Sequence, residues 1–94
     1  MKIYLVSETW CWSDERMEKH FAAFSNKEDA IRFKDRQVDL IVYNYCDMYD
    51  CENNSLDDLE EWVTVTANSP MLFGILSCDG TEEIEIEVTE LEVR

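Results

Sequence analysis

The C-terminal part of the chain alternates strictly between branched aliphatic residues and glutamate. The two alternating sets are Ile84, Ile86, Val88 and Glu83, Glu85, Glu87. This period of two is typical of a strand with one buried and one exposed face. A mostly apolar run at 71–78 precedes it, and Asp79-Gly80 between the two is a strong hairpin signal. The pattern therefore predicts a C-terminal β-hairpin.

Alternation also marks the N-terminal part of the chain. Residues 2–9 and 16–24 predict two strands that pair with each other through a loop at 10–15. In the C-terminal strand the parity slips by one after Glu90. A β-bulge is expected there, because it would return Leu91 and Val93 to the core face.

Between residues 26 and 49, apolar residues recur at steps of three and four, with no glycine or proline. Ser25 followed by Glu28 is a capping box, so a helix of roughly 20 residues or more is expected to begin there. Lys34 falls within the apolar stripe, and its aliphatic stem is expected to run along the stripe's edge. Ser55 predicts the start of a second, short helix.

Two boundaries stay open at this point. The long helix either continues or breaks at 43–47, and 62–66 fits the end of the short helix or a strand, because it is β-branched. The predicted fold is a single α+β domain over residues 1–94. It comprises an antiparallel sheet of about four strands, with one long and one short helix packed on one face and the C-terminal hairpin.

Composition narrows the class of protein. With 94 residues, of which 46% are apolar, the chain can form one compact core. Its formal charge of −14 should repel nucleic acid and anionic lipid, so direct binding to either, and to a membrane, is not expected. The N-terminus lacks the apolar region of a secretory signal, which favours a cytoplasmic protein with reduced thiols.

The charge is unevenly distributed along the sequence. Residues 1–36 are balanced, whereas residues 37–93 contain fifteen acids and no lysine or arginine. Alternate strand residues lie roughly 6.6–7 Å apart on one face, a spacing comparable with that of phosphates along a DNA strand. An acidic interaction surface is therefore predicted. Its members are Glu83, Glu85, Glu87, Asp57, Asp58, Glu60 and Glu61.

Trp10 and Trp12 form a candidate aromatic hot spot on the predicted loop at 10–15. Large aromatic side chains are mostly buried, so at least one of them is expected to fold back onto the sheet. If both are exposed, they are the natural centre of a partner interface.

Catalysis and metal binding receive little support. His20 is the only imidazole, and the two glycines, at 74 and 80, allow no phosphate-binding glycine loop. No enzyme activity, cofactor or metal is predicted.

A metal-binding module is the remaining alternative: the acidic segment 50–61 partly matches a calcium loop but has Ser55 at the glycine position. The four cysteines (Cys11, Cys46, Cys51, Cys78) contain no CxxC pair, and Cys46 and Cys78 are expected in the core.

The predicted order of strand, loop, strand and helix carries Phe24-Ser25-Asn26-Lys27-Glu28-Asp29-Ala30 at the helix start, and an acidic strand closes the chain. This arrangement resembles small uncharacterised acidic proteins of bacteriophages and mobile elements. The likeness covers residues 1–35 and, more loosely, the ending. It implies a context in which many such proteins bind and inhibit host proteins, some by imitating DNA, and it implies no catalytic residue.

The function predicted from these features is a non-enzymatic acidic protein-interaction module. In its sharper form it is a nucleic-acid-mimicking inhibitor of a basic host protein of unspecified identity. The alternative is a structural or oligomeric small domain whose acidic surface serves solubility only. That alternative predicts a homodimer formed through aromatic patches or a free sheet edge.

Overall fold

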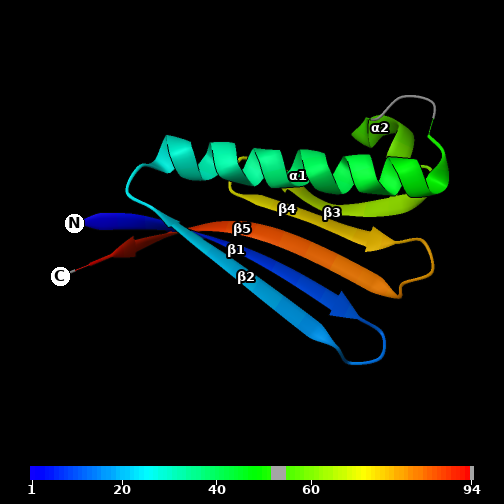
Figure 1. Ribbon diagram of the computed structural model, residues 1–94, viewed down its shortest axis with the longest axis horizontal. Coiled ribbons are helices and arrows are strands. Elements are labelled where there is room, and N and C mark those ends of the chain that lie inside the picture. The colour runs from blue at the N-terminus through cyan, green and yellow to red at the C-terminus, as the bar shows by residue number, and fades with distance from the viewer. Residues whose placement is uncertain (52–54, 94) are drawn as a thin grey trace.

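The computed structural model describes residues 1–51 and 55–93 and shows an α+β fold (Figure 1). In chain order the elements are β1 (Lys2–Trp12), β2 (Met17–Phe24), α1 (Lys27–Tyr49), α2 (Leu56–Leu59), β3 (Val63–Ser69), β4 (Leu72–Ser77) and β5 (Glu82–Glu92). The strands form one antiparallel sheet in the order β2-β1-β5-β4-β3. Helix α1 lies along one face of the sheet, and α2 lies beside its C-terminal half (Figure 1).

The sheet has five strands, so the prediction of about four is wrong. The additional strand is β3, which takes in residues 63–66 of the segment 62–66 that the sequence left open between helix and strand, while residue 62 lies in the turn before it. Helix α2 is only four residues long. The β-branched residues that follow it are extended and pair with β4, because such side chains pack well on a pleated surface.

The predicted C-terminal hairpin is present, and its second strand lies at the centre of the sheet. Strand β5 pairs with β4 on one side and with β1 on the other. The β1–β5 pairing is continuous from Lys2 opposite Glu92 to Trp12 opposite Glu82. Residues 83–87 are therefore paired on both sides, which makes this part of β5 a rigid support for the side chains that it carries.

The bulge expected after Glu90 is absent. Leu91 pairs with Ile3 in unbroken register and remains 38% exposed on the face away from α1. The register shift occurs instead between Val65 and Ala67 of β3, opposite Gly74. At this shift the Thr66 hydroxyl occupies the space that a Cβ atom on Gly74 would need.

Helix α1 runs for 23 residues without a break. Its N-cap is Asn26 and not Ser25, because the Asn26 side chain accepts hydrogen bonds from the backbone N–H groups of Glu28 (2.8 Å) and Asp29 (3.3 Å). At the other end, Asp50 adopts the left-handed conformation (φ 58°) and donates its N–H to the Cys46 carbonyl. Ser55 caps α2, as predicted, by accepting from the backbone N–H of Asp58.

The core lies between α1 and the sheet. Its fully buried large side chains are Phe73, Leu59, Ile75, Ile84, Ile86, Val6 and Cys46. Lys34 belongs to this layer and is only 4% exposed, so it does not run along the edge as expected. Its ammonium group donates to the carbonyls of Ser69 (3.1 Å) and Pro70 (3.3 Å), which ties the β3–β4 turn to α1.

Neither helix in residues 1–51 and 55–93 has both the length and the apolar character that a membrane span requires.

Candidate functional site

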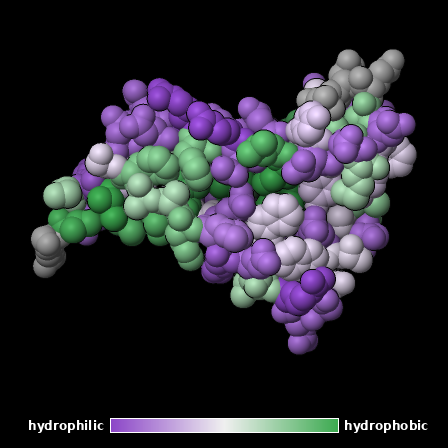
Figure 2. Space-filling model, viewed as in Figure 1, coloured by the Kyte–Doolittle hydropathy of each residue, from purple (hydrophilic) through white to green (hydrophobic). Residues whose placement is uncertain are grey.

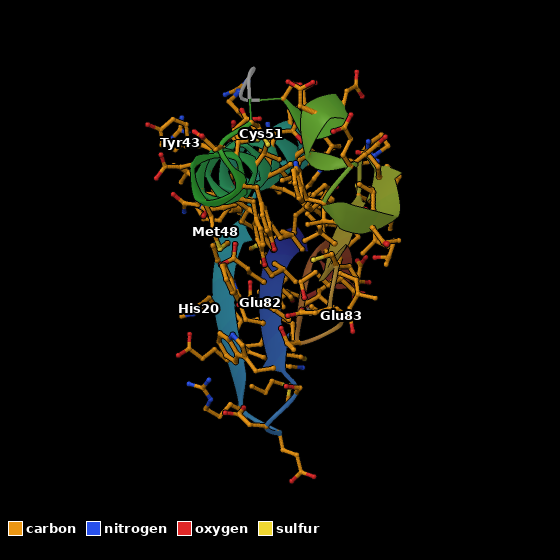
Figure 3. All side chains as sticks on the ribbon, turned by 90° about the vertical axis from the view of Figure 1, so that its right-hand side faces the viewer. His20, Tyr43, Met48, Cys51, Glu82 and Glu83 are labelled. Carbon is orange, nitrogen blue, oxygen red and sulfur yellow. The ribbon has the colours of Figure 1, made fainter. Side chains whose placement is uncertain are left out.

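In the part of the chain that the structure describes, neither helix lies over the face of the sheet opposite α1, and we call this the open face (Figure 1). The period of two in β5 buries the aliphatic residues under α1 and turns Glu83, Glu85 and Glu87 outward, where all three are exposed. Because β5 is the middle strand, this acidic row runs down the centre of the open face. In Figure 3, Glu83 lies on the far side of the sheet from Tyr43 of α1.

Among the described residues, the acidic row has little compensating positive charge. None of the ion pairs found among the described residues involves its three glutamates. Their cross-strand neighbours on both sides are uncharged: Ser7, Thr9, Cys11, Leu72, Gly74 and Leu76. Lys19, two strands away on β2, shares a shallow hollow of about 250 Å³ with Glu83 and Glu85 but forms no ion pair with either. The mutual repulsion of the row is therefore largely uncompensated.

The second predicted acidic group lies elsewhere on the molecule. Asp57, Asp58, Glu60 and Glu61 belong to α2 and the turn after it. Leu59 of α2 is fully buried in the same core as Ile84, so α2 lies on the helix side of the sheet. The structure therefore places the two acidic groups on opposite sides of the sheet and does not join them into one surface.

Trp10 and Trp12 lie within β1 and not in a loop, because the pairing of β1 with β5 continues as far as Trp12. Both face α1, both are half-buried, and their rings stack with centroids 6.1 Å apart. The Trp10 indole N–H donates to Glu8 Oε2 (3.0 Å) and that of Trp12 to Glu82 Oε2 (2.7 Å). The condition for an exposed hot spot, exposure of both rings, is not met.

These tryptophans belong to a wider aromatic cluster that sequence reasoning missed. The Tyr45 hydroxyl also donates to Glu82. Tyr45 stacks on Tyr49 (6.2 Å), which in turn stacks on Trp62 with nearly parallel rings (5.5 Å). In Figure 2 the zone between α1 and the β1–β2 hairpin has the pale colour of intermediate hydropathy. The four-residue spacing of Tyr45 and Tyr49 was a signal for their contact, but nothing local pointed to Glu82 or Trp62.

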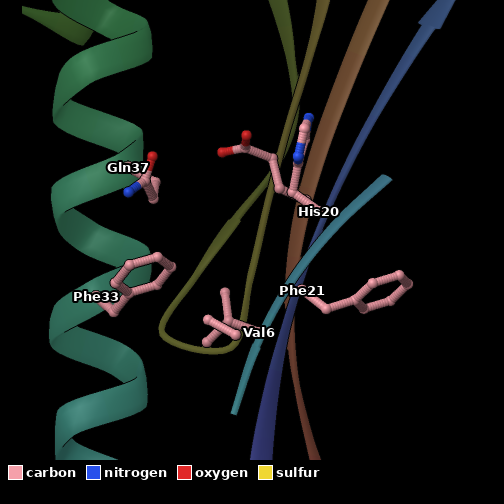
Figure 4. A pocket seen from close by; sticks show the side chains of 7 residues that line it. Val6, His20, Phe21, Phe33 and Gln37 are labelled. Atoms are coloured by element: carbon pink, nitrogen blue, oxygen red, sulfur yellow. The ribbon is translucent and has the colours of Figure 1, made fainter. Parts of the chain in front are cut away.

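A cavity of about 290 Å³ opens between α1 and the β1–β2 hairpin. The residues that line it are Val6, Glu8, His20, Phe21, Ala22, Phe33 and Gln37. Figure 4 shows Phe33 and Gln37 on α1 facing Val6 and His20 across the gap, while Phe21 points away from the helix. His20 is an exposed residue of β2, and its side chain lines the rim of this cavity.

Within this cavity Glu8 is unusual. It is the cross-strand partner of His20, so the two side chains lie on the same face. Its Oε2 accepts from Trp10, whereas its Oε1 is enclosed and has no hydrogen-bond partner among the described residues. Unsatisfied buried polar atoms are rare in folded proteins, and each calls for a physical explanation.

The cysteines do not form a site. All four are free thiols. Cys46 is buried as predicted, and burial, reinforced by the neighbouring Cys51, raises its pKa to about 11. Cys78 is exposed, so its predicted place in the core is wrong: it follows the last residue of β4 and lies in the turn. Among the described residues no three His, Cys, Asp or Glu side chains converge on a common metal position. Residues 52–54 of the candidate calcium loop at 50–61 lie outside the described residues.

Comparison with protein-family models, with curated proteins and with solved structures finds no match to this chain. Any functional conclusion therefore depends on the residues themselves.

Proposed function

We propose that the chain is a non-enzymatic protein-interaction module whose open face binds a basic surface of a partner protein. The observation that carries this proposal is the acidic row: Glu83, Glu85 and Glu87 are exposed on the central strand and form no ion pair within residues 1–51 and 55–93. Like charges held side by side cost stability. A basic partner would remove that cost on binding.

In its sharper form, the proposal is that the row imitates a nucleic-acid backbone and so inhibits a nucleic-acid-binding protein. Alternate residues of a strand present their carboxylates roughly 7 Å apart. The backbone beneath them is held by β1 and β4, so the spacing is pre-organised before binding. This agrees with the context implied by the resemblance to acidic phage proteins. The acids of α2 contribute to the overall field but not to the same interface.

A second candidate function is self-association, with the acids serving solubility only. It is favoured by β2, an edge strand whose Met17 and Phe21 are both exposed. Exposed strand edges are templates for pairing with another chain. Against it stands the charge of −14 on every copy, which opposes dimerisation at low salt.

The decisive experiment compares two triple variants that remove the same charge from opposite sides of the sheet. Row variant E83Q/E85Q/E87Q and control variant D57N/E60Q/E61Q are used with the wild type as baits in a bacterial lysate at low and high salt. The proposal predicts a basic partner that wild type and control retain at low salt and release at high salt, and that the row variant does not retain.

Competition then separates the two forms of the proposal. Double-stranded DNA should displace the chain from its purified partner if the row imitates nucleic acid, and should leave the complex intact otherwise. Equal capture by the row variant would overturn the proposal. A salt-stabilised dimer in sedimentation without a heterologous partner would establish self-association instead.

A further inference from the structure

We propose that the cavity between α1 and the β1–β2 hairpin is a binding site for a primary alkylammonium group, on either a lysine side chain or a small free amine. The cavity opens on the helix side of the sheet, whereas the acidic row lies on the open face. This inference therefore stands apart from the proposed function, and either can fail alone.

The first argument is the incomplete hydrogen bonding of Glu8. One carboxylate oxygen accepts from the Trp10 indole, and the other is enclosed without a partner among the described residues. The terminal torsion of a glutamate is soft, so a small rotation presents the unpartnered oxygen to the cavity that this side chain lines. A donor bound there would satisfy it.

The second argument is the set of acceptors around the cavity. Gln37 on α1 and His20 on β2 flank Glu8, and Figure 4 shows their side chains on opposite sides of the gap. The carboxylate oxygen of Glu8 and the amide oxygen of Gln37 can accept two of the three N–H donors of an ammonium group, which leaves the third to water. A guanidinium group is favoured where it can bind both carboxylate oxygens at once, and here one of them is occupied by Trp10.

The third argument is the shape and polarity of the rest of the lining. Val6, Ala22 and Phe33 provide an apolar wall for a short aliphatic stem. A cavity of about 290 Å³ is at the small end for organic ligands, and its lining contains no lysine or arginine. An inorganic cation is less well matched, because no three His, Cys, Asp or Glu side chains among the described residues converge on a metal position.

The test is a titration of ¹⁵N-labelled protein, observed through its backbone amide resonances. The probes are pentylamine, the neutral and nearly isosteric pentanol, and Nα-acetyl-lysine methylamide. Pentylamine should cause saturable shifts at Ala22 and Gln37 and should bind on the order of tenfold more tightly than pentanol, because the charge-assisted hydrogen bonds are lost with the alcohol. Tight binding of the lysine derivative assigns the site to lysine side chains, and its failure to bind assigns the site to free amines.

Two variants and a matched control make the test specific. Glu8→Gln keeps an acceptor for Trp10 but removes the charge, and should weaken pentylamine binding on the order of tenfold. Ala22→Leu fills the cavity and should abolish binding while Glu8 remains. Glu87→Gln removes a charge from the opposite face of the sheet, outside the lining, and should change affinity less than twofold. Equal binding of pentanol, undiminished binding to both cavity variants, or displacement by equimolar sodium would overturn the inference.

Discussion

The indole N–H of Trp12 donates a 2.7 Å hydrogen bond to Oε2 of Glu82, a residue seventy positions away in the sequence. The Tyr45 hydroxyl donates to the other oxygen of the same carboxylate. One glutamate therefore links β1, β5 and α1 from the helix side of the sheet. Its neighbour Glu83 faces the solvent on the open face, so two adjacent acids in one strand have different roles.

Replacing Glu82 should destabilise the fold. Glu82→Ala leaves the Trp12 N–H and the Tyr45 hydroxyl without their acceptor and should lower the free energy of unfolding by about 1–3 kcal/mol in urea denaturation. Glu82→Gln retains one acceptor and should lose less. Glu83→Ala, which removes the same side chain from the open face, is the control and should not lower stability. Equal losses at the two positions would contradict the structural role of Glu82.

Relieving the acidic row should stabilise the protein. Glu85 lies at its centre, and Glu85→Gln should raise the free energy of unfolding by about 0.2–1 kcal/mol, because two like-charge repulsions are removed. The gain should shrink as NaCl increases, since salt screens the same repulsion in the wild type. Glu28→Gln provides a contrast: Glu28 lies in the first turn of α1, where negative charge is favourable, so this change should destabilise. A salt-independent gain at Glu85 would exclude electrostatic repulsion as its cause.

The close approach of Gly74 and Thr66 should make the glycine indispensable. Gly74→Ala places a Cβ atom against the Thr66 hydroxyl and should cost about 1–3 kcal/mol as the β3 bulge is pushed away. Thr66→Ala removes that hydroxyl, so the double variant should regain most of the loss. Additive effects in this double-mutant cycle, measured by thermal or urea unfolding, would show that the two residues do not compete for space.

Asp50 ends α1 at a stability cost. Its φ of 58° is in the left-handed region, and its negative charge lies at the unfavourable end of the helix dipole, where the last turn has no basic residue. Asp50→Gly should therefore raise the free energy of unfolding by about 0.5–1 kcal/mol. Asp50→Asn isolates the contribution of charge and should give a smaller increase. A destabilised glycine variant in thermal unfolding would refute this account of the helix end.

Stability should decline at alkaline pH through Cys46. Burial raises the pKa of this thiol from 9.0 to about 11, so the folded protein favours the neutral form more than the unfolded chain does. The stabilising contribution is complete below about pH 9 and is lost as pH rises towards 11. Urea midpoints measured between pH 8 and 10.5 should fall more steeply for the wild type than for Cys46→Ala.

Thiol labelling provides an independent check on Cys46. At pH 8 the exposed Cys78 should react rapidly with a disulfide reagent, whereas Cys46 should react only when the protein unfolds. Cys78→Ser should remove the fast phase alone. Rapid labelling of Cys46 in the native protein would contradict its burial.

Several features of this fold follow from local sequence and were predicted correctly. The alternation at residues 82–88 defines which side chains of β5 are buried and which form the acidic row. The uninterrupted apolar stripe predicts α1, and Ser55 predicts the start of α2. Each depends only on the period of a helix or strand, or on a side chain that bonds its own neighbouring backbone, so each can be read within a few residues.

Other predictions failed because a local pattern was compatible with more than one structure. Residues 63–66 became part of strand β3 only because β4 was there to pair with them. Asn26 and not Ser25 caps α1, although both residue types suit that position. The expected bulge near Leu91 did not form, since the pairing of β1 and β5 over 11 residues outweighed the burial of one exposed leucine.

By itself the sequence determined the class of fold, the excess of acids after residue 36 and the outward direction of Glu83, Glu85 and Glu87. Only the tertiary structure decided that the acids of α2 lie on the opposite side of the sheet and that Glu82 is a structural acceptor. It also decided that Glu8 lines a cavity and has one oxygen without a hydrogen-bond partner among the described residues. The physical reason is the separation along the chain over which each effect acts. Periodicity and capping act over a few residues, whereas these contacts arise from strand register and helix packing between segments far apart in the chain, to which no local pattern refers.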